Sequence, residues 1–437
     1  MVGADDPSYN KVRPPLPRPG SPGLGRTARL RPPRQPVPAA NRAIGRLARW
    51  LPAPLTLLVL IAAAPGDEAW YPGSDLQLEA HGFASFGYLD TWGDNWLGPT
   101  RGGTTQFWEV ATNVVARPLD RLRIGAQLYA RDLVDYDNGR VMLDWAYADY
   151  RLTDEIGVQV GRVKIPLGLY NENIDVDVAR ASVFMPVQFY SLVDRDLYIS
   201  IDGAKIYGHV EMGTLGSGDY ALYAGRKPLR TDGAFATNYA ASEGLGDQVN
   251  AISTSWAAGG MVQWNPPLSG LAARLSLGDL HEFDVQASSS TTGLSTDTSV
   301  TNYYEAILSL QYDIHAMTFA AEYERLRGRG QTTVQPIDLT QPLLDSGERA
   351  YISATWHMRR WLEWYAAFEQ SWADIHQPSG LHSYAWVGAV DVLPLANWSL
   401  KAEFREEEGT EGLLASDNPQ GLSKHWQVLA LKTTVDF

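Results

Sequence analysis

Apolar and polar residues alternate with a period of two over many successive segments of about ten residues, and this pattern strongly limits the possible folds. In the clearest segment, Leu122, Ile124 and Leu128 fall on one face, while Arg123 and Gln127 fall on the other. Successive side chains of a β-strand point to opposite faces, so we expect these segments to be strands. A soluble sandwich and a membrane barrel share this alternation, because the apolar face meets a core in one and lipid in the other.

The lengths of the connections between these segments distinguish the two folds. Short connections are expected near residues 117–120, 153–155, 213–218, 265–270, 313–315, 358–360 and 393–397. Long connections are expected near residues 90–104, 133–140, 169–196, 228–250, 285–300, 329–346, 375–380 and 406–422. Short and long connections alternate almost throughout. This predicts an all-β chain that forms a transmembrane antiparallel β-barrel of about 16 strands, with short periplasmic turns and long outer loops.

The composition supports an all-β chain and excludes several kinds of site. The 15 Trp and 21 Tyr suit half-buried strand surfaces. The absence of cysteine excludes disulfides, thiolate metal sites and cysteine nucleophiles. The net charge of −14 argues against a nucleic-acid partner. We find no phosphate-binding loop, no zinc-protease motif and no hydrolase elbow, so we expect no cofactor, no metal and no enzymatic activity.

The amino-terminal region is expected to lie outside the barrel. Residues 1–40 are rich in proline and arginine and lack apolar periodicity, so we expect a disordered extension or a start placed too far upstream. Residues 41–69 combine basic residues, a short apolar run and small residues, the layout of a secretory signal peptide. The apolar run is too short to span a bilayer. We therefore expect export, with the barrel at residues 70–437.

The last segment of the chain ends on an aromatic residue. Counting back by twos from Phe437 gives Val435, Thr433 and Leu431, while Asp436 lies on the other face. This segment resembles the closing strand of bacterial outer-membrane β-barrels. In that family the pattern is also the signal that the barrel-assembly machinery reads, so the resemblance implies that Phe437 is an assembly signal.

The segment at residues 161–172 carries a second resemblance. Its sequence, GRVKIPLGLYNE, is similar to the Gly-Arg-x-Lys-x-Pro-x-Gly segment of Gram-negative porins, especially the group related to phosphate-selective porins O and P. The resemblance implies a water-filled channel in the outer membrane for passive diffusion of small hydrophilic solutes or ions. It also implies that the third long loop, residues 169–196, narrows the pore, and that the protein is a homotrimer.

Charged residues near this segment are the candidate pore residues. They are Arg121, Arg123, Arg131, Arg162, Lys164, Glu172, Asp175, Asp177, Asp194 and Asp196. Acids on the loop opposite an arginine ladder would set up a transverse field, and rings of charge govern ion selectivity. We expect a weak preference for cations, or no selectivity.

Arg162 and Lys164 continue the lipid-facing parity of Val158 and Val160, which is costly for cations. A bulge at Gly161 would resolve this, as would a rim position for both cations. At the rim they would anchor the loop or bind lipopolysaccharide phosphates, and this role stands beside the pore role.

Several alternatives stay open. One is an anion- or phosphate-selective porin. Others are an outer-membrane barrel hydrolase, a secreted soluble β-lectin or propeller, and a structural barrel with a plugged lumen. The expected partners of a porin are outer-membrane lipid and lipopolysaccharide, the assembly machinery and the diffusing solutes.

Overall fold

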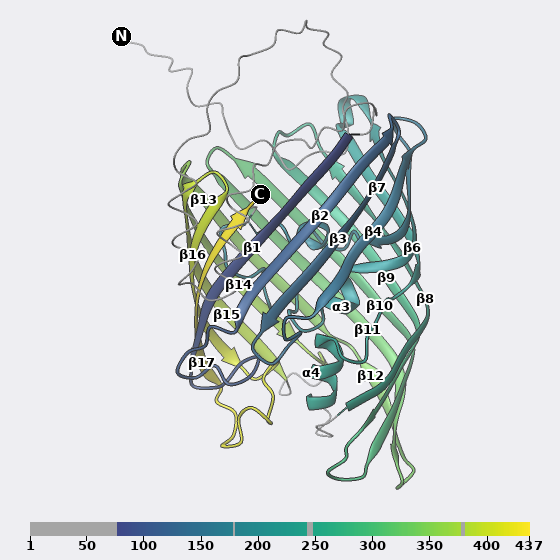
Figure 1. Cartoon of the computed structure of the whole chain (residues 1–437), viewed down its shortest axis with the longest axis vertical. Coiled ribbons are helices and arrows are strands. Elements are labelled where there is room, and N and C mark those ends of the chain that lie inside the picture. The colour runs from purple at the N-terminus through teal and green to yellow at the C-terminus, as the bar shows by residue number, and fades with distance from the viewer. Residues whose placement is uncertain (1–76, 178–179, 243–247, 377–380) are drawn as a thin grey trace, which may run out of the picture. The chain divides into compact units, whose positions relative to one another are not determined.

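The described residues form a closed antiparallel β-barrel (Figure 1). The computed structural model describes residues 77–177, 180–242, 248–376 and 381–437. The predicted extension at 1–40 and the predicted signal peptide at 41–69 lie outside the described residues, as do residues 70–76 of the predicted barrel. Within the described part, no helix has the length and apolar character needed to cross a bilayer.

The first strands and helices extend through the fourth long connection. Their bounds are β1 (Gln77–Trp92), β2 (Phe107–Leu119), β3 (Leu122–Leu133), β4 (Val141–Arg151), β5 (Gly157–Lys164), η2 (Asn171–Asn173), α3 (Arg195–Tyr198), β6 (Ser200–Glu211), η4 (Gly213–Leu215), β7 (Ser217–Arg226) and α4 (Ala234–Ser242).

Among the described residues that follow, the regular elements are all strands. Their bounds are β8 (Gln248–Asn265), β9 (Leu271–Ser288), β10 (Ser295–Ile314), β11 (Met317–Gln335), β12 (Leu339–Asp345), β13 (Glu348–Arg359), β14 (Leu362–Trp372), β15 (His382–Leu395), β16 (Trp398–Gly409) and β17 (His425–Asp436).

Each strand pairs with its neighbours in chain order, and β17 pairs with β1 to close the barrel. Strands β12 and β13 both pair with β11, one after the other along its length, so the 17 strands fill 16 positions. The prediction of about 16 antiparallel strands is therefore confirmed. Phe437 completes the closure, because its backbone N–H donates to the Gly82 carbonyl (3.0 Å) and its carbonyl accepts from the Gly82 N–H (2.9 Å).

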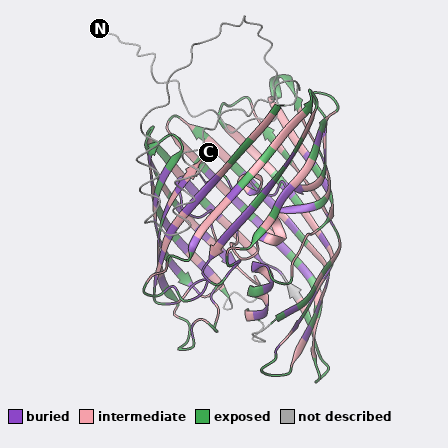
Figure 2. Ribbon diagram, in the orientation of Figure 1, coloured by how far each residue is buried: buried purple, intermediate pink, exposed green. Residues whose placement is uncertain are grey.

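Polarity is distributed in the opposite way to that of a soluble sandwich. Large apolar side chains such as Leu222 (61% exposed) and Ile352 (60%) face outward, while Glu369 and Arg405 are almost fully buried inside. Figure 2 shows the alternation of buried and exposed residues along the strands. Because water disfavours so much exposed apolar surface, the outer face matches lipid, and the alternation is that of a transmembrane barrel.

The alternation of short turns and long connections is borne out, with one correction. The predicted long connections at 285–300 and 329–346 are mostly strand, because β9 runs to Ser288, β10 begins at Ser295, and β11 and β12 continue the ladder. The resulting hairpins project beyond one end of the barrel (Figure 1, lower right). The prediction failed there because these segments are rich in Ser, Thr and Gln, and strand assignment from sequence depends on a continuous apolar face.

Candidate functional site: the lumen and the loop that crosses it

The connection between β5 and β6, residues 165–199, lies inside the barrel and reaches the wall opposite its own strands. The backbone N–H groups of Val183 and Phe184 donate to Glu403 Oε2 on β16, at 2.7 and 3.1 Å. The N–H of Gln188 donates to Glu369 Oε2 on β14, at 3.1 Å. A buried loop has backbone donors without strand partners, and these wall carboxylates accept them.

Both of these wall acids share one arginine with a third acid, Glu407. Arg405 donates to Glu369 and Glu407 at 2.8 Å each and lies 3.3 Å from Glu403. Gln188 of the loop also donates to Glu407 through its side chain, at 3.0 Å. One guanidinium therefore faces three carboxylates, and this part of the wall keeps an excess of negative charge.

Glu322 on β11 holds two points of the loop at once. It accepts hydrogen bonds from the Leu169 N–H (2.8 Å), the Tyr190 hydroxyl, the Tyr351 hydroxyl (2.7 Å) and Ser309 Oγ (2.6 Å). No cation takes part in this set of hydrogen bonds. Neutral donors therefore satisfy a carboxylate that is 3% exposed.

Asp175 is the centre of an ion-pair cluster beside β3–β5. Lys164 Nζ lies 2.5 Å from Asp175 Oδ2, and Arg195 bridges Asp175 and Asp144 at 2.7 Å each. Burial alone would raise the pKa of Asp175, but the charges of Lys164 and Arg195 outweigh it and hold the pKa well below its ordinary value.

Asp177 makes the equivalent contact with the opposite wall. It pairs with Lys401 on β16 (2.9 Å), Lys432 on β17 (2.8 Å) and Arg180 of the loop (2.8 Å), and accepts a hydrogen bond from Thr434 (2.7 Å). Burial acts to raise the pKa of Asp177, and the neighbouring cations lower it well below the ordinary range.

The other predicted loop acids lie in different surroundings. Glu172 pairs with Lys205 on β6 (2.6 Å), and this cation outweighs burial and lowers the Glu172 pKa. Asp196 Oδ2 is buried without a hydrogen-bond partner among the described residues, and burial, assisted by Asp137, raises the pKa of Asp196. Asp194 is half-buried just before α3.

The predicted arginine ladder does not act as one row. Arg131 pairs with Asp137 (2.5 Å) and donates to the Leu192 carbonyl of the loop (2.8 Å), so it supports the loop. Arg123 pairs with Asp149 (2.8 Å). Arg121 is exposed at the β2–β3 turn and donates to the Leu152 carbonyl. Each side chain has its own partner, so no continuous basic row faces the loop acids.

The structure separates the two cations of the porin-like segment. Lys164 lies inside the barrel with Asp175, whereas Arg162 forms a bidentate pair with Asp202, whose side chain is 49% exposed. The bulge suggested at Gly161 is absent, because the β4–β5 register runs through it without a shift. Instead Gly161 has φ +130°, where a Cβ would lie 2.3 Å from the Ala146 carbonyl oxygen.

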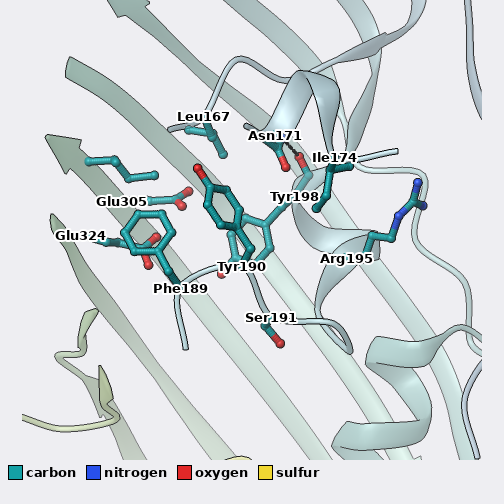
Figure 3. Close-up of a pocket in the computed structure, with 11 residues that line it drawn as sticks. Leu167, Asn171, Ile174, Phe189, Tyr190, Ser191, Arg195, Tyr198, Glu305 and Glu324 are labelled. Carbon is teal, nitrogen blue, oxygen red and sulfur yellow. Dashed lines mark hydrogen bonds between the residues drawn. The ribbon is translucent and has the colours of Figure 1, made fainter. Parts of the chain in front are cut away.

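A narrow cavity separates the loop from β10 and β11 (Figure 3). Figure 3 shows Tyr190 between Glu305 and Glu324 on the wall and Tyr198 on the loop side, while Arg195 extends away from the two acids. The cavity has a volume of about 20 Å³, enough for one or two water molecules. Arg349 lies 3.6 Å from Glu324 and is the cation that faces these acids.

The candidate residues chosen from the sequence omitted the wall acids that contact the loop. Glu322, Glu369, Glu403 and Glu407 stand on the polar faces of their strands, so their inward orientation follows from the alternation. Nothing in the local sequence indicates that the loop amides dock on these carboxylates.

Solved structures that resemble the barrel include an outer-membrane channel and a porin. The outer-membrane channel DcaP of Acinetobacter baumannii aligns with a TM-score of 0.53 at 9% identity, over 86% of this chain and 100% of that chain. The anion-selective porin from Comamonas acidovorans aligns with a TM-score of 0.52 at 11% identity, over 83% and 100%. Salmonella typhi OmpF, in complex with daunomycin, aligns with a TM-score of 0.51 at 12% identity, over 85% and 100%.

At these identities the likeness shows that the chain has the porin-type barrel fold. No protein-family model matches the sequence, and no curated protein matches it.

Proposed function

We propose that the protein is an outer-membrane porin and not an enzyme: a channel for passive diffusion of small hydrophilic solutes or ions, with a preference for cations. The barrel supplies the passage, and the loop at 165–199 narrows it. We also propose, from the resemblances in the sequence, that residues 41–69 direct export, that Phe437 is read during assembly, and that the barrel forms a homotrimer.

The excess of buried carboxylates on one wall is the observation that carries the cation preference. On β10–β16, the buried acids are Glu305, Glu322, Glu324, Glu363, Glu369, Asp391, Glu403 and Glu407. The cations of this wall that pair with its buried acids are fewer, namely Arg349 and Arg405. A negative wall raises the local concentration of cations and repels anions.

The loop acids add little negative charge of their own to the passage, because Asp175, Asp177 and Glu172 are neutralised by their ion pairs. The word "anion-selective" describes the porin from Comamonas acidovorans, and the acidic wall of this chain argues for the opposite preference.

Reversal potentials across planar bilayers in a salt gradient test the proposal. The wild-type channel should pass cations in preference to anions. The double variant E305Q/E324Q should lower the cation-to-anion permeability ratio by up to about fivefold, because a unit charge 4 Å from an ion in water contributes about 1 kcal/mol. The matched control E406Q removes an exposed carboxylate of β16 and should leave the ratio unchanged.

A second candidate is a structural barrel with a plugged lumen, favoured by the close packing of the loop against both walls and by the small cavity between them. The same recordings decide between the two. A barrel that inserts without conducting is a plugged barrel, and a wild-type channel that prefers anions overturns the cation preference. Hydrolysis of phospholipid by the purified barrel would contradict the proposal that the protein is not an enzyme.

A further inference from the structure

The outward face of β8–β11 changes from apolar to cationic as the strands leave their short turns. On β11 the outward residues after the β10–β11 turn are Phe319, Ala321 and Tyr323, and then Arg325, Arg327 and Arg329. The row through Leu275, Leu308 and Tyr323 is apolar. Four residue pairs further along the ladder, the row contains Asp279, Tyr304 and Arg327, and the next outward row contains His281, Asn302 and Arg329.

This change in polarity lies where the outer edge of the apolar belt is expected. From Phe319 to Arg327 the strand advances about 26 Å, which at a barrel tilt of about 40° is about 20 Å along the membrane normal. The apolar belt of an outer-membrane barrel is about 25 Å tall and is bounded by aromatic girdles. Tyr304 (52% exposed) and Trp256 (42%) provide the aromatic side chains at this height.

A groove in this face provides space for a ligand. It has a volume of about 410 Å³, and its lining is mainly apolar, with Leu277 and Tyr304 at its sides. Ala258 and Ala306 are small, so its floor lies deeper than the neighbouring surface. Arg325 and Arg327 line it at the end toward the long loops, and Asp279 lines it on β9.

The arginines differ in whether their charge is already neutralised. Arg325 forms an ion pair with Glu348 on β13. Arg327 and Arg329 are exposed, and neither has a hydrogen bond or an ion pair with any residue whose side chain the structure describes. Two unpaired guanidinium groups beside an apolar groove at the membrane interface form a site for an anion that is attached to a hydrocarbon chain.

We propose that this groove binds a phosphorylated, acylated sugar lipid of the outer leaflet, with one acyl chain against Leu277 and Ala306 and a phosphate on Arg327 and Arg329. The inference rests on the proposed location of the barrel in the outer membrane. A sugar headgroup is favoured over a simple phospholipid, because Asp279 at the side of the groove accepts a hydroxyl donor while the two guanidinium groups hold the phosphate. Asp279 Oδ1 has no hydrogen-bond partner within the described part of the chain.

Native mass spectrometry of the full barrel, extracted in detergent and titrated with bisphosphorylated lipid A, tests this site. The wild-type barrel should retain one lipid A at this site. The double variant R327A/R329A should weaken its binding at least about tenfold, since each cation near a membrane surface contributes about 1 kcal/mol toward an anionic lipid. The variant A306W fills the groove, keeps both arginines and should weaken binding as well.

The matched control is R359A/R360A, which removes two exposed arginines at the β13–β14 turn on the opposite rim. It should bind lipid A like the wild-type barrel. Heat-modifiable migration on gels shows that each variant is folded. Equal loss in the control overturns the site. The site is also overturned if the wild-type barrel binds dephosphorylated lipid A or phosphatidylethanolamine as tightly as it binds bisphosphorylated lipid A, because the surface would then be a general lipid contact.

The channel proposal is tested separately. Arg327 and Arg329 face away from the lumen, so the R327A/R329A barrel should conduct ions as the wild-type barrel does. If the wild-type barrel conducts ions but does not bind lipid A, the lipid site is rejected and the channel proposal stands. If it binds lipid A but does not conduct, the channel proposal is rejected and the lipid site stands.

Discussion

Glu322 joins two separate points of the lumen loop to the same wall position. Its carboxylate accepts from Leu169 near the start of the loop and from Tyr190 near its end, and Tyr351 and Ser309 supply the remaining donors from the wall. Hydrogen bonds to a charged acceptor contribute about 1.5–3 kcal/mol each. No cation among the described residues pairs with this carboxylate, so the hydrogen bonds that it accepts from neutral N–H and O–H groups are what hold the loop at this position.

The isosteric variant E322Q should loosen the loop. It keeps the shape of the side chain but replaces a charged acceptor of four donors with a neutral amide that has one acceptor oxygen. We expect current fluctuations of single channels to become about tenfold more frequent, from the loss of roughly 1.5 kcal/mol. Trypsin should also cleave faster after Arg180 or Arg195.

The control for this variant is E282Q, which removes an exposed carboxylate of β9 that contacts Ser255 and not the loop. Fluctuations and cleavage that stay at the wild-type level in E322Q would show that Glu322 does not hold the loop.

The loop at 165–199 behaves as one element with an ionic anchor on each side. Asp175 joins it to Lys164 beside its own strands, and Asp177 joins it to Lys401 and Lys432 on the opposite wall. A carboxylate buried without a cation would be costly, and here each has at least two cations. The anchors fix the loop across the lumen and neutralise its acids, so the charge of the passage comes from the wall.

The position of the loop should resist mild acid. The pKa values of Asp175 and Asp177 are lower in the docked loop than in a free one, so docking gains free energy at pH values above the ordinary aspartate pKa of about 4 and loses it below. Single-channel fluctuations should therefore be constant from pH 8 to about pH 5 and rise below about pH 4.

The double variant D175N/D177N should remove this acid response, and its fluctuations should be frequent already at neutral pH. An acid response of the wild-type channel that begins near pH 6 would contradict the role of these two aspartates.

In the closed barrel as a whole, the last residue of the chain extends the ladder between β1 and β17 by one residue pair. Phe437 exchanges both backbone hydrogen bonds with Gly82, and its ring lies over that glycine, where a Cβ would be 2.4 Å from the ring. The backbone bonds do not require an aromatic side chain. The structural role of Phe437 and its proposed role as an assembly signal can therefore be separated.

Phe437→Ala should fold like the wild-type chain when refolded into detergent micelles, with a loss of about 1–3 kcal/mol for the uncovered ring contact. In cells the same variant should accumulate in the outer membrane at a much lower level. Heat-modifiable migration measures folding in both settings, and V435A, which removes apolar surface from the same strand, is the matched control. Equal outer-membrane levels of Phe437→Ala and V435A would reject the assembly signal.

The arrangement of the barrel could be predicted because strand geometry is local. A period of two assigns Leu128 to one face and Gln127 to the other whatever the rest of the chain does. The alternation of short and long connections then indicates a barrel in which consecutive strands are neighbours. The same reasoning failed for the projecting hairpins of β9–β12, where Ser, Thr and Gln take the place of the apolar residues on which the sequence alternation depends.

The period of two and the lengths of the connections were enough to predict the all-β class, the strand number, the inward set of polar side chains and the closing strand that ends at Phe437. Which charges meet could be read only from the folded barrel. Asp177 and Lys432 are 255 residues apart, and no spacing rule links them. Ion pairs and loop docking depend on the curvature of the closed barrel, which brings distant strands face to face, whereas alternation depends only on the backbone of one strand.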